Sequence, residues 1–180
     1  MKVFISGGTG FIGTELLKIL IEENYEVTLL SRSKKFNKKL REKITLITGD
    51  PKYAGDWQKS LRDQDTVINL AGAPVFKIWT NKAKKEIHES RSNTTLNIVK
   101  GLCQYNNKKV HFISASAIGY YGYHIDKTIT ETDSPGNDFL ANITKSCETE
   151  ALKAEKNNIG VVLCRIGIVL GKNKGAFKTL

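Results

Sequence analysis

The chain has 180 residues, of which 40% are hydrophobic and 26% charged, and this apolar fraction excludes a disordered tail protein. The sequence has no run of 18 apolar residues, so we expect no membrane span, and we expect the N-terminus to be a first strand and not a signal peptide. The net charge of +10 indicates an anionic partner, which by charge alone could be nucleic acid, a membrane surface or a phosphorylated small molecule.

Apolar runs separated by helical patterns predict six strands in chain order. The strands are residues 2–6, 25–30, 44–48, 66–70, 110–114 and 161–165. The helical patterns predict three helices, residues 11–23, 80–105 with Thr80 as N-cap, and 138–157. Strands that alternate with helices predict an α/β fold, a doubly wound parallel sheet in one domain over residues 1–180.

A glycine-rich loop joins the first predicted strand to the first predicted helix. Gly7 permits a tight turn, Gly10 lets the backbone approach a pyrophosphate, and Gly13 allows close packing of helix on strand. The helix N-terminus then receives the negative charge. A turn that merely needs glycines is the alternative, and the flanking strand and helix favour dinucleotide binding. The expected cofactor contacts here are Gly7, Thr9, Gly10, Phe11, Ile12 and Gly13.

The end of the second strand bears on which dinucleotide binds. NAD enzymes usually carry an acidic residue there for the adenine ribose hydroxyls, and this chain has Ser31 and Arg32 instead. Arg32 can contact a 2′-phosphate with its guanidinium fork, and Ser31 can donate a hydrogen bond. The sequence therefore favours NADP over NAD, with a merely solvated basic loop as the alternative.

Several segments together resemble one enzyme family. The glycine loop, residues 69–72 (NLAG) and residues 114–117 (SASA) resemble the extended branch of the short-chain dehydrogenase/reductase superfamily. The segments 79–91, 114–122 and 165–171 are similar to an atypical branch labelled NAD-dependent epimerase/dehydratase-like. The resemblance implies a Rossmann fold with strand order 3-2-1-4-5-6 and hydride transfer to an unidentified small or nucleotide-linked substrate.

The resemblance also assigns individual residues. Asn69, Ala71 and Gly72 would line the cofactor, and Asp50, after the third strand, would lie near the adenine. Ser116 matches the hydroxyl that orients the substrate in this superfamily.

The proton donor of this superfamily is a Tyr hydroxyl, and a Lys four residues later lowers its pKa and binds the nicotinamide ribose. Counted from Ser116, Lys145 occupies the lysine position, whereas Ala141 stands where the Tyr is expected. Tyr120 and Tyr121 directly follow Ser116 and are candidate proton donors, unless they only form an aromatic wall. The missing Tyr leaves open a second function, a non-catalytic NADP(H)-binding sensor.

Arg91 has two interpretations. It could bind an anionic substrate, or it could pair with Glu86 or Glu89 on the same predicted helix.

The remaining expectations concern partners, cysteines and completeness. Cys103, Cys147 and Cys164 lie far apart without a CxxC pattern, so we expect no metal site, no disulfide and a cytoplasmic location. The basic segments lack interleaved stacking aromatics, so we expect a small-molecule partner, with no nucleic acid and no membrane. Compared with the family, the chain is expected to lack the C-terminal substrate part, which would leave this form inactive and favour a homodimer.

Overall fold

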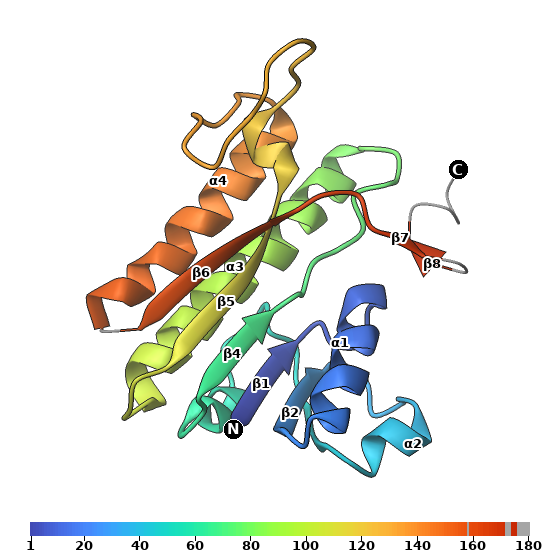
Figure 1. Ribbon diagram of the computed structural model, residues 1–180, viewed down its shortest axis with the longest axis vertical. Coiled ribbons are helices and arrows are strands. Elements are labelled where there is room, and N and C mark those ends of the chain that lie inside the picture. The colour runs from blue at the N-terminus through green and yellow to red at the C-terminus, as the bar shows by residue number, and fades with distance from the viewer. Residues whose placement is uncertain (158, 172–173, 176–180) are drawn as a thin grey trace.

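A single parallel sheet forms the centre of the computed structural model, which describes residues 1–157, 159–171 and 174–175. The six strands lie in the order β3-β2-β1-β4-β5-β6, which confirms the predicted order (Figure 1). Their bounds are β1 Lys2–Ser6, β2 Glu26–Ser31, β3 Thr45–Thr48, β4 Thr66–Asn69, β5 His111–Ala117 and β6 Gly160–Ile166.

The three predicted helices are present, one of them with a different end, and a short helix of four residues was not predicted. The α-helices are α1 Phe11–Glu22, α2 Lys38–Arg41, α3 Asn81–Tyr105 and α4 Phe139–Leu152. Thr80 is confirmed as the N-cap of α3, because its side chain accepts a hydrogen bond from the backbone N–H of Ala83. The last predicted helix was expected to reach residue 157, but it tightens into the 3-10 helix η3 (Lys153–Asn157) after α4.

Shorter elements were not predicted. The 3-10 helices η1 (Asp56–Leu61) and η2 (Ile118–Tyr121) follow β3 and β5, respectively, and a short hairpin pairs β7 (Leu170–Gly171) with β8 (Lys174–Gly175).

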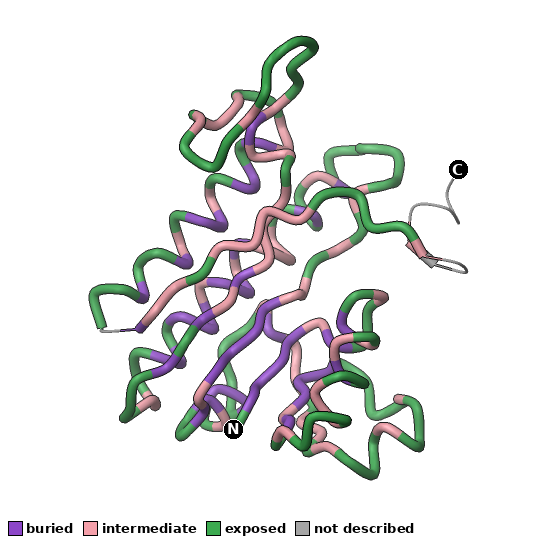
Figure 2. The backbone as a smooth tube through the Cα atoms, in the orientation of Figure 1, coloured by how far each residue is buried: buried purple, intermediate pink, exposed green. Residues whose placement is uncertain are grey.

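The sheet carries a core on each face, because successive strand residues point to opposite sides. On β1, Phe4 packs with Ile98 and Leu102 of α3, whereas Ile5 packs with Leu17 of α1 on the other face. All of these side chains are fully buried, and Figure 2 shows β1 and β4 as the most buried strands. Burial on both faces explains why the strands are continuous apolar runs.

The carboxyl ends of the parallel strands meet at one edge of the sheet, and Asn69 ties two of them together there. Its Oδ1 accepts hydrogen bonds from the Ser6 hydroxyl at 2.7 Å and from the backbone N–H of Ala71 at 3.2 Å. Its Nδ2 donates to the Thr95 hydroxyl at 3.3 Å. This buried amide therefore fixes the ends of β1 and β4 against α3 and sets the direction of the chain after β4.

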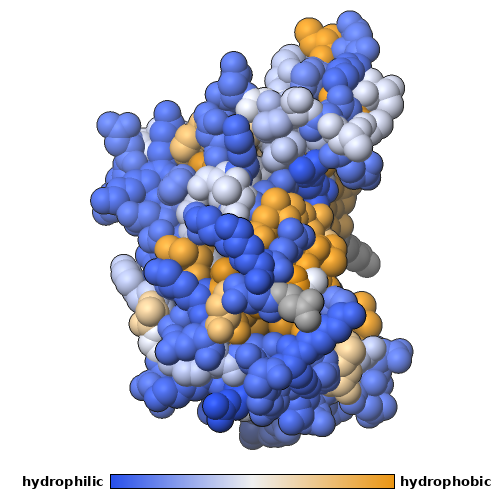
Figure 3. Space-filling view, turned by 90° about the vertical axis from the view of Figure 1, so that its left-hand side faces the viewer, coloured by the Kyte–Doolittle hydropathy of each residue, from blue (hydrophilic) through white to orange (hydrophobic). Residues whose placement is uncertain are grey.

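The molecular surface is uneven in polarity. On the side of α4 and β6, apolar side chains gather in the middle of the face and hydrophilic ones surround them (Figure 3). The loop between η2 and α4 is largely exposed in Figure 2. Among the described residues, no helix is both long and apolar enough to cross a membrane.

Candidate functional site

The glycine loop is packed so tightly that side chains are excluded at two positions. Gly7 has φ +77°, and a Cβ there would lie 2.5 Å from the backbone N of Ala71. A Cβ on Gly13 would lie 2.5 Å from the carbonyl oxygen of Gly7. The loop after β1 therefore lies directly against the loop after β4, and α1 begins close behind it. Gly10 is the N-cap of α1.

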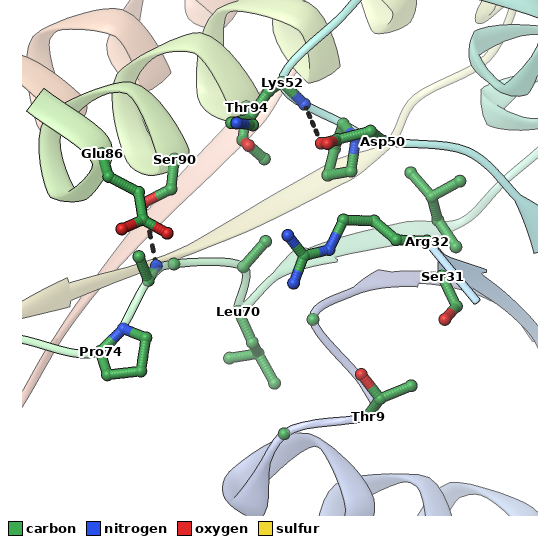
Figure 4. A pocket seen from close by; sticks show the side chains of 17 residues that line it. Thr9, Ser31, Arg32, Asp50, Lys52, Leu70, Pro74, Glu86, Ser90 and Thr94 are labelled. Atoms are coloured by element: carbon green, nitrogen blue, oxygen red, sulfur yellow. Dashed lines mark hydrogen bonds between the residues drawn. The ribbon is translucent and has the colours of Figure 1, made fainter. Parts of the chain in front are cut away.

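A cavity of about 290 Å³ lies at this edge of the sheet, and we call it the sheet-edge cavity (Figure 4). The glycine loop forms one wall, the ends of β2 and β3 a second, and α3 with the loop after β4 a third. The predicted cofactor contacts that line it are Gly7, Thr9, Gly10, Ser31, Arg32, Ala71 and Gly72, and Asp50 lines it as well.

Other predicted contacts do not line this cavity. Phe11, Ile12 and Gly13 lie in the first turn of α1, where Gly13 is buried by its packing on the loop and Ile12 is exposed. Asn69 is buried below the cavity and acts through the backbone of Ala71, as described above. Their roles as direct cofactor contacts stay predictions.

Arg32 extends from the end of β2 toward the middle of the cavity (Figure 4). No hydrogen bond joins it to the other residues drawn there. Ser31 differs, because its hydroxyl donates to the carbonyl of Ser33 at 2.9 Å and accepts from the backbone N–H of Ser33 at 3.2 Å. Of the two side chains, Arg32 is therefore the one whose N–H groups can donate hydrogen bonds to a ligand.

The α3 wall contributes polar residues that the sequence did not identify as site residues. Glu86, Ser90 and Thr94 line the cavity at four-residue spacing, which places them on one helix face. The Ser90 hydroxyl accepts from the backbone N–H of Ala73 at 2.9 Å, and Glu86 forms an ion pair with Lys77 at 2.7 Å. The spacing was visible in the sequence, but nothing there indicated that this face would lie across from the glycine loop.

Arg91 lies behind the same wall, and its two interpretations can now be compared. Glu86 pairs with Lys77 and Glu89 with Lys85, so neither carboxylate pairs with Arg91. Instead, its Nη1 donates to the carbonyls of Ala73 at 2.9 Å and Ile87 at 3.2 Å. Burial lowers the pKa of the guanidinium. Arg91 thus fastens the loop after β4, and a Cβ on Gly72 would lie 2.9 Å from its Cζ.

A second group of polar residues lies at the carboxyl ends of β5 and β6. We call it the Arg165 cluster, and its members are Ser116, Tyr120, Tyr121, Glu148 and Arg165. Arg165 donates twice to the carboxylate of Glu148, from Nε at 2.9 Å and from Nη2 at 2.8 Å. The Ser116 hydroxyl donates to the same carboxylate. This bidentate pairing raises the pKa of Arg165.

The two tyrosines complete this cluster. Arg165 Nη1 donates to the Tyr121 hydroxyl at 2.6 Å, and the Arg165 Cζ lies 3.7 Å from the centre of the Tyr120 ring. The two rings meet edge to face at 5.2 Å. The structure therefore brings together Ser116, Tyr120 and Tyr121, as predicted, and does so through Glu148 and Arg165, which were not among the predicted site residues.

Lys145 is not part of this cluster. It lies on the exposed side of α4, whereas Glu148 is the α4 residue that contacts Ser116. Lys145 therefore makes no hydrogen bond to Ser116, whose described side-chain partner on α4 is Glu148. Ala141, at the expected tyrosine position, is fully buried. A contact between Lys145 and the nicotinamide ribose stays a prediction.

Comparison with known proteins identifies the family of this chain. The model of the NAD dependent epimerase/dehydratase family matches residues 3–178. An epimerase family protein of Arabidopsis thaliana, an SDR39U1 homolog described as chloroplastic, is 35% identical over 98% of this chain and 51% of its own length. The epimerase family protein YfhF of Bacillus subtilis is 34% identical over 98% of this chain and 57% of its own length.

Solved structures agree on the fold. Human epimerase family protein SDR39U1 (isoform 2) with NADPH has a TM-score of 0.79 at 25% identity, over 99% of this chain and 58% of that one. MoeE5 in complex with UDP-glucose and NAD has a TM-score of 0.77 at 21% identity, over 92% of this chain and 54% of that one, which shows the fold alone. The chain spans about half the length of the curated relatives it matches. It belongs to the NAD dependent epimerase/dehydratase family and forms a Rossmann nucleotide-binding domain of that family.

Proposed function

We propose that the chain is the NADP(H)-binding part of an oxidoreductase that acts by hydride transfer on a small or nucleotide-linked substrate. The observation that carries this proposal is Arg32, whose guanidinium points into a cavity with the glycine loop as another wall and has no hydrogen bond to the other residues drawn around it. A 2′-phosphate would accept hydrogen bonds from that guanidinium. The solved human relative with NADPH supports the same choice of cofactor.

The residues present fit such a dinucleotide. Gly7 and Gly13 keep side chains out of the loop, so the backbone N–H groups at the start of α1 are accessible to a pyrophosphate. Ser90 and Arg91 hold the Ala73 backbone from its two sides, which gives the cavity a fixed third wall. When bound, the nicotinamide would supply or accept the hydride.

The Arg165 cluster is the proposed position of the substrate carbonyl or hydroxyl. Ser116 already donates to Glu148, so it would accept a hydrogen bond from a substrate hydroxyl. Tyr121 Oη already accepts from Arg165, so its own proton is the one it would donate. In this arrangement Arg165 would supply the positive charge beside the tyrosine hydroxyl that a lysine supplies in the wider superfamily.

Ala141 favours a second candidate function, a nucleotide sensor without turnover. Binding and turnover separate the two. We expect NADPH to bind at least tenfold more tightly than NADH in a fluorescence titration, and a longer form of the chain to oxidise NADPH measurably with a panel of carbonyl substrates. Tight NADPH binding with no oxidation by this chain or a longer form of it would favour the sensor. A Kd for NADH equal to that for NADPH would contradict the proposed cofactor.

A further inference from the structure

Thr94 carries a hydroxyl whose environment the fold alone does not explain. It lies on α3, its side chain is 1% exposed, and it lines the sheet-edge cavity. Among the described residues, its Oγ1 has no hydrogen-bond partner. Of the buried side-chain atoms in that condition, it is the one that borders this cavity. A buried polar group without a partner costs free energy, so native proteins rarely retain one without a use.

Other threonines in the same fold show what such a hydroxyl ordinarily does. Threonine in a helix commonly bonds the carbonyl four residues earlier. Thr144 does this with Leu140 at 2.7 Å, and Thr149 does it with Lys145 at 2.8 Å. The adjacent Thr95 is equally buried, and its hydroxyl accepts a hydrogen bond from Asn69. The Thr94 hydroxyl makes neither kind of bond.

The part of the cavity that Thr94 borders is fixed by neighbouring contacts. Asn97, one turn further along α3, donates to the carbonyl of Pro51 at 3.0 Å. Gln58 in turn donates to the carbonyl of Asn97 at 2.7 Å. These buried bonds hold α3 against the segment after β3, so Thr94 faces the same end of the cavity as Asp50 and Arg32 (Figure 4).

We infer that the Thr94 hydroxyl hydrogen-bonds the adenine base of the dinucleotide. This inference rests on the proposed function, because Arg32 at the 2′-phosphate would place the adenosine at this end. Adenine offers ring nitrogens that accept hydrogen bonds and an amino group that donates them. A hydroxyl matches either kind of atom because it both donates and accepts. Thr94 is thus assigned as a base contact on the α3 wall, opposite the glycine loop that would hold the pyrophosphate.

The inference predicts effects of opposite sign in the free and the bound protein. Thr94→Val replaces the hydroxyl with a methyl group of similar size, which removes an unpartnered polar atom from the free protein. We expect the Tm of the free protein to rise by a few degrees. The same change removes one hydrogen bond from the complex, so the Kd for NADPH should rise about 3- to 10-fold. A purely structural threonine would not give this combination.

The experiment measures Kd by titration calorimetry for NADPH and for adenosine 2′,5′-bisphosphate, which is the adenosine half alone. Thr94→Val should weaken both by the same factor, and Thr94→Ser, which keeps the hydroxyl, should retain most of the affinity. Thr144→Val is the matched control, because it removes a satisfied hydroxyl away from the cavity and should leave both Kd values unchanged.

Each other outcome has a definite meaning. Unchanged Kd values for Thr94→Val would overturn the inference while leaving the proposed function intact. Weaker NADPH binding with unchanged bisphosphate binding would overturn the assignment to the adenine. Failure of the unaltered chain to bind either ligand would overturn the proposed function, and the inference with it.

Discussion

The sheet-edge cavity and the Arg165 cluster lie along the same edge of one sheet, yet they are built in opposite ways. In the cavity, Arg32 extends without a hydrogen bond to its neighbours and Thr94 keeps a buried hydroxyl without a described partner. In the cluster, Glu148 and Arg165 satisfy each other and also hold Ser116 and Tyr121. Polar groups that lack hydrogen-bond partners around a cavity can bind a ligand. Polar groups that bond each other hold a fixed arrangement without a ligand.

Mutations in the two regions should therefore affect different properties of the protein. Changes in the cluster should affect the stability of the free protein, because its contacts are made within the chain. Changes at Arg32 should affect binding and leave stability nearly unchanged, since this residue is exposed and its guanidinium forms no hydrogen bond with the residues drawn around the cavity. Three experiments, taken from the largest expected effect to the smallest, test this difference between the two regions, and a fourth at Arg32 tests the central claim.

The largest effect is expected for Arg165→Met. The change leaves the Glu148 carboxylate, 6% exposed at its side chain, without its cationic partner. Breaking a buried pair in this way destabilises a protein by about 3 kcal/mol, which urea denaturation would measure. The surface pair of Lys153 with Glu150 provides the control, and Lys153→Met should cost under about 1 kcal/mol. Equal losses of unfolding free energy in the two variants would show that the Arg165–Glu148 pair stabilises the fold no more than a surface ion pair does.

Gly13→Ala should lower both stability and binding. Its Cβ would meet the Gly7 carbonyl oxygen at 2.5 Å, so the glycine loop must shift away from α1. Such overpacking typically costs about 1–3 kcal/mol, and the displaced loop should weaken NADPH binding. At Gly55 a Cβ would have its closest contact at 3.5 Å from Trp57, so Gly55→Ala is a control that should change little. Unaltered NADPH binding in Gly13→Ala would show that the glycine loop does not contribute to cofactor binding.

The smallest effect concerns the exposed loop before α4. The hydrogen bond from Lys127, together with those from Thr130, lowers the pKa of Asp133 from 3.8 to about 2. Because the folded pKa is depressed, the carboxylate stabilises the fold above about pH 4, and this contribution is lost as the pH falls toward 2.

The Tm difference between the unaltered chain and Asp133→Asn measures this contribution. It should be positive at pH 5 and shrink toward pH 2. A difference that does not change over this pH range would show that the Asp133 contacts do not form in solution.

The sequence predicted those parts of the molecule that are encoded locally. The strands were visible as apolar runs, and the glycine loop was recognisable because Gly7 and Gly13 are required by close contacts within a few residues or with the adjacent strand end. Arg32 was identified because its place at the end of β2 follows directly from the strand itself.

The parts that were missed depend on which elements come to face each other. Thr94 is one of several polar residues along α3, and nothing local indicates that its side chain borders the cavity. The role of Lys145 stays a prediction, and the contact that α4 makes with Ser116 comes from Glu148, which a count of residues from Ser116 did not indicate. In the structure α4 presents Glu148 to Ser116 and leaves Lys145 exposed.

The central claim is that Arg32 reads the 2′-phosphate of NADP(H) in the sheet-edge cavity, and Arg32→Ala tests it most directly. We predict a rise in the Kd for NADPH of about 10- to 100-fold, since charge-assisted hydrogen bonds are lost, with little change in the Kd for NADH or in Tm. The measurement is a pair of fluorescence titrations, with NADPH and with NADH, on both proteins. Unchanged NADPH affinity, or an equal loss for both nucleotides, would contradict the account.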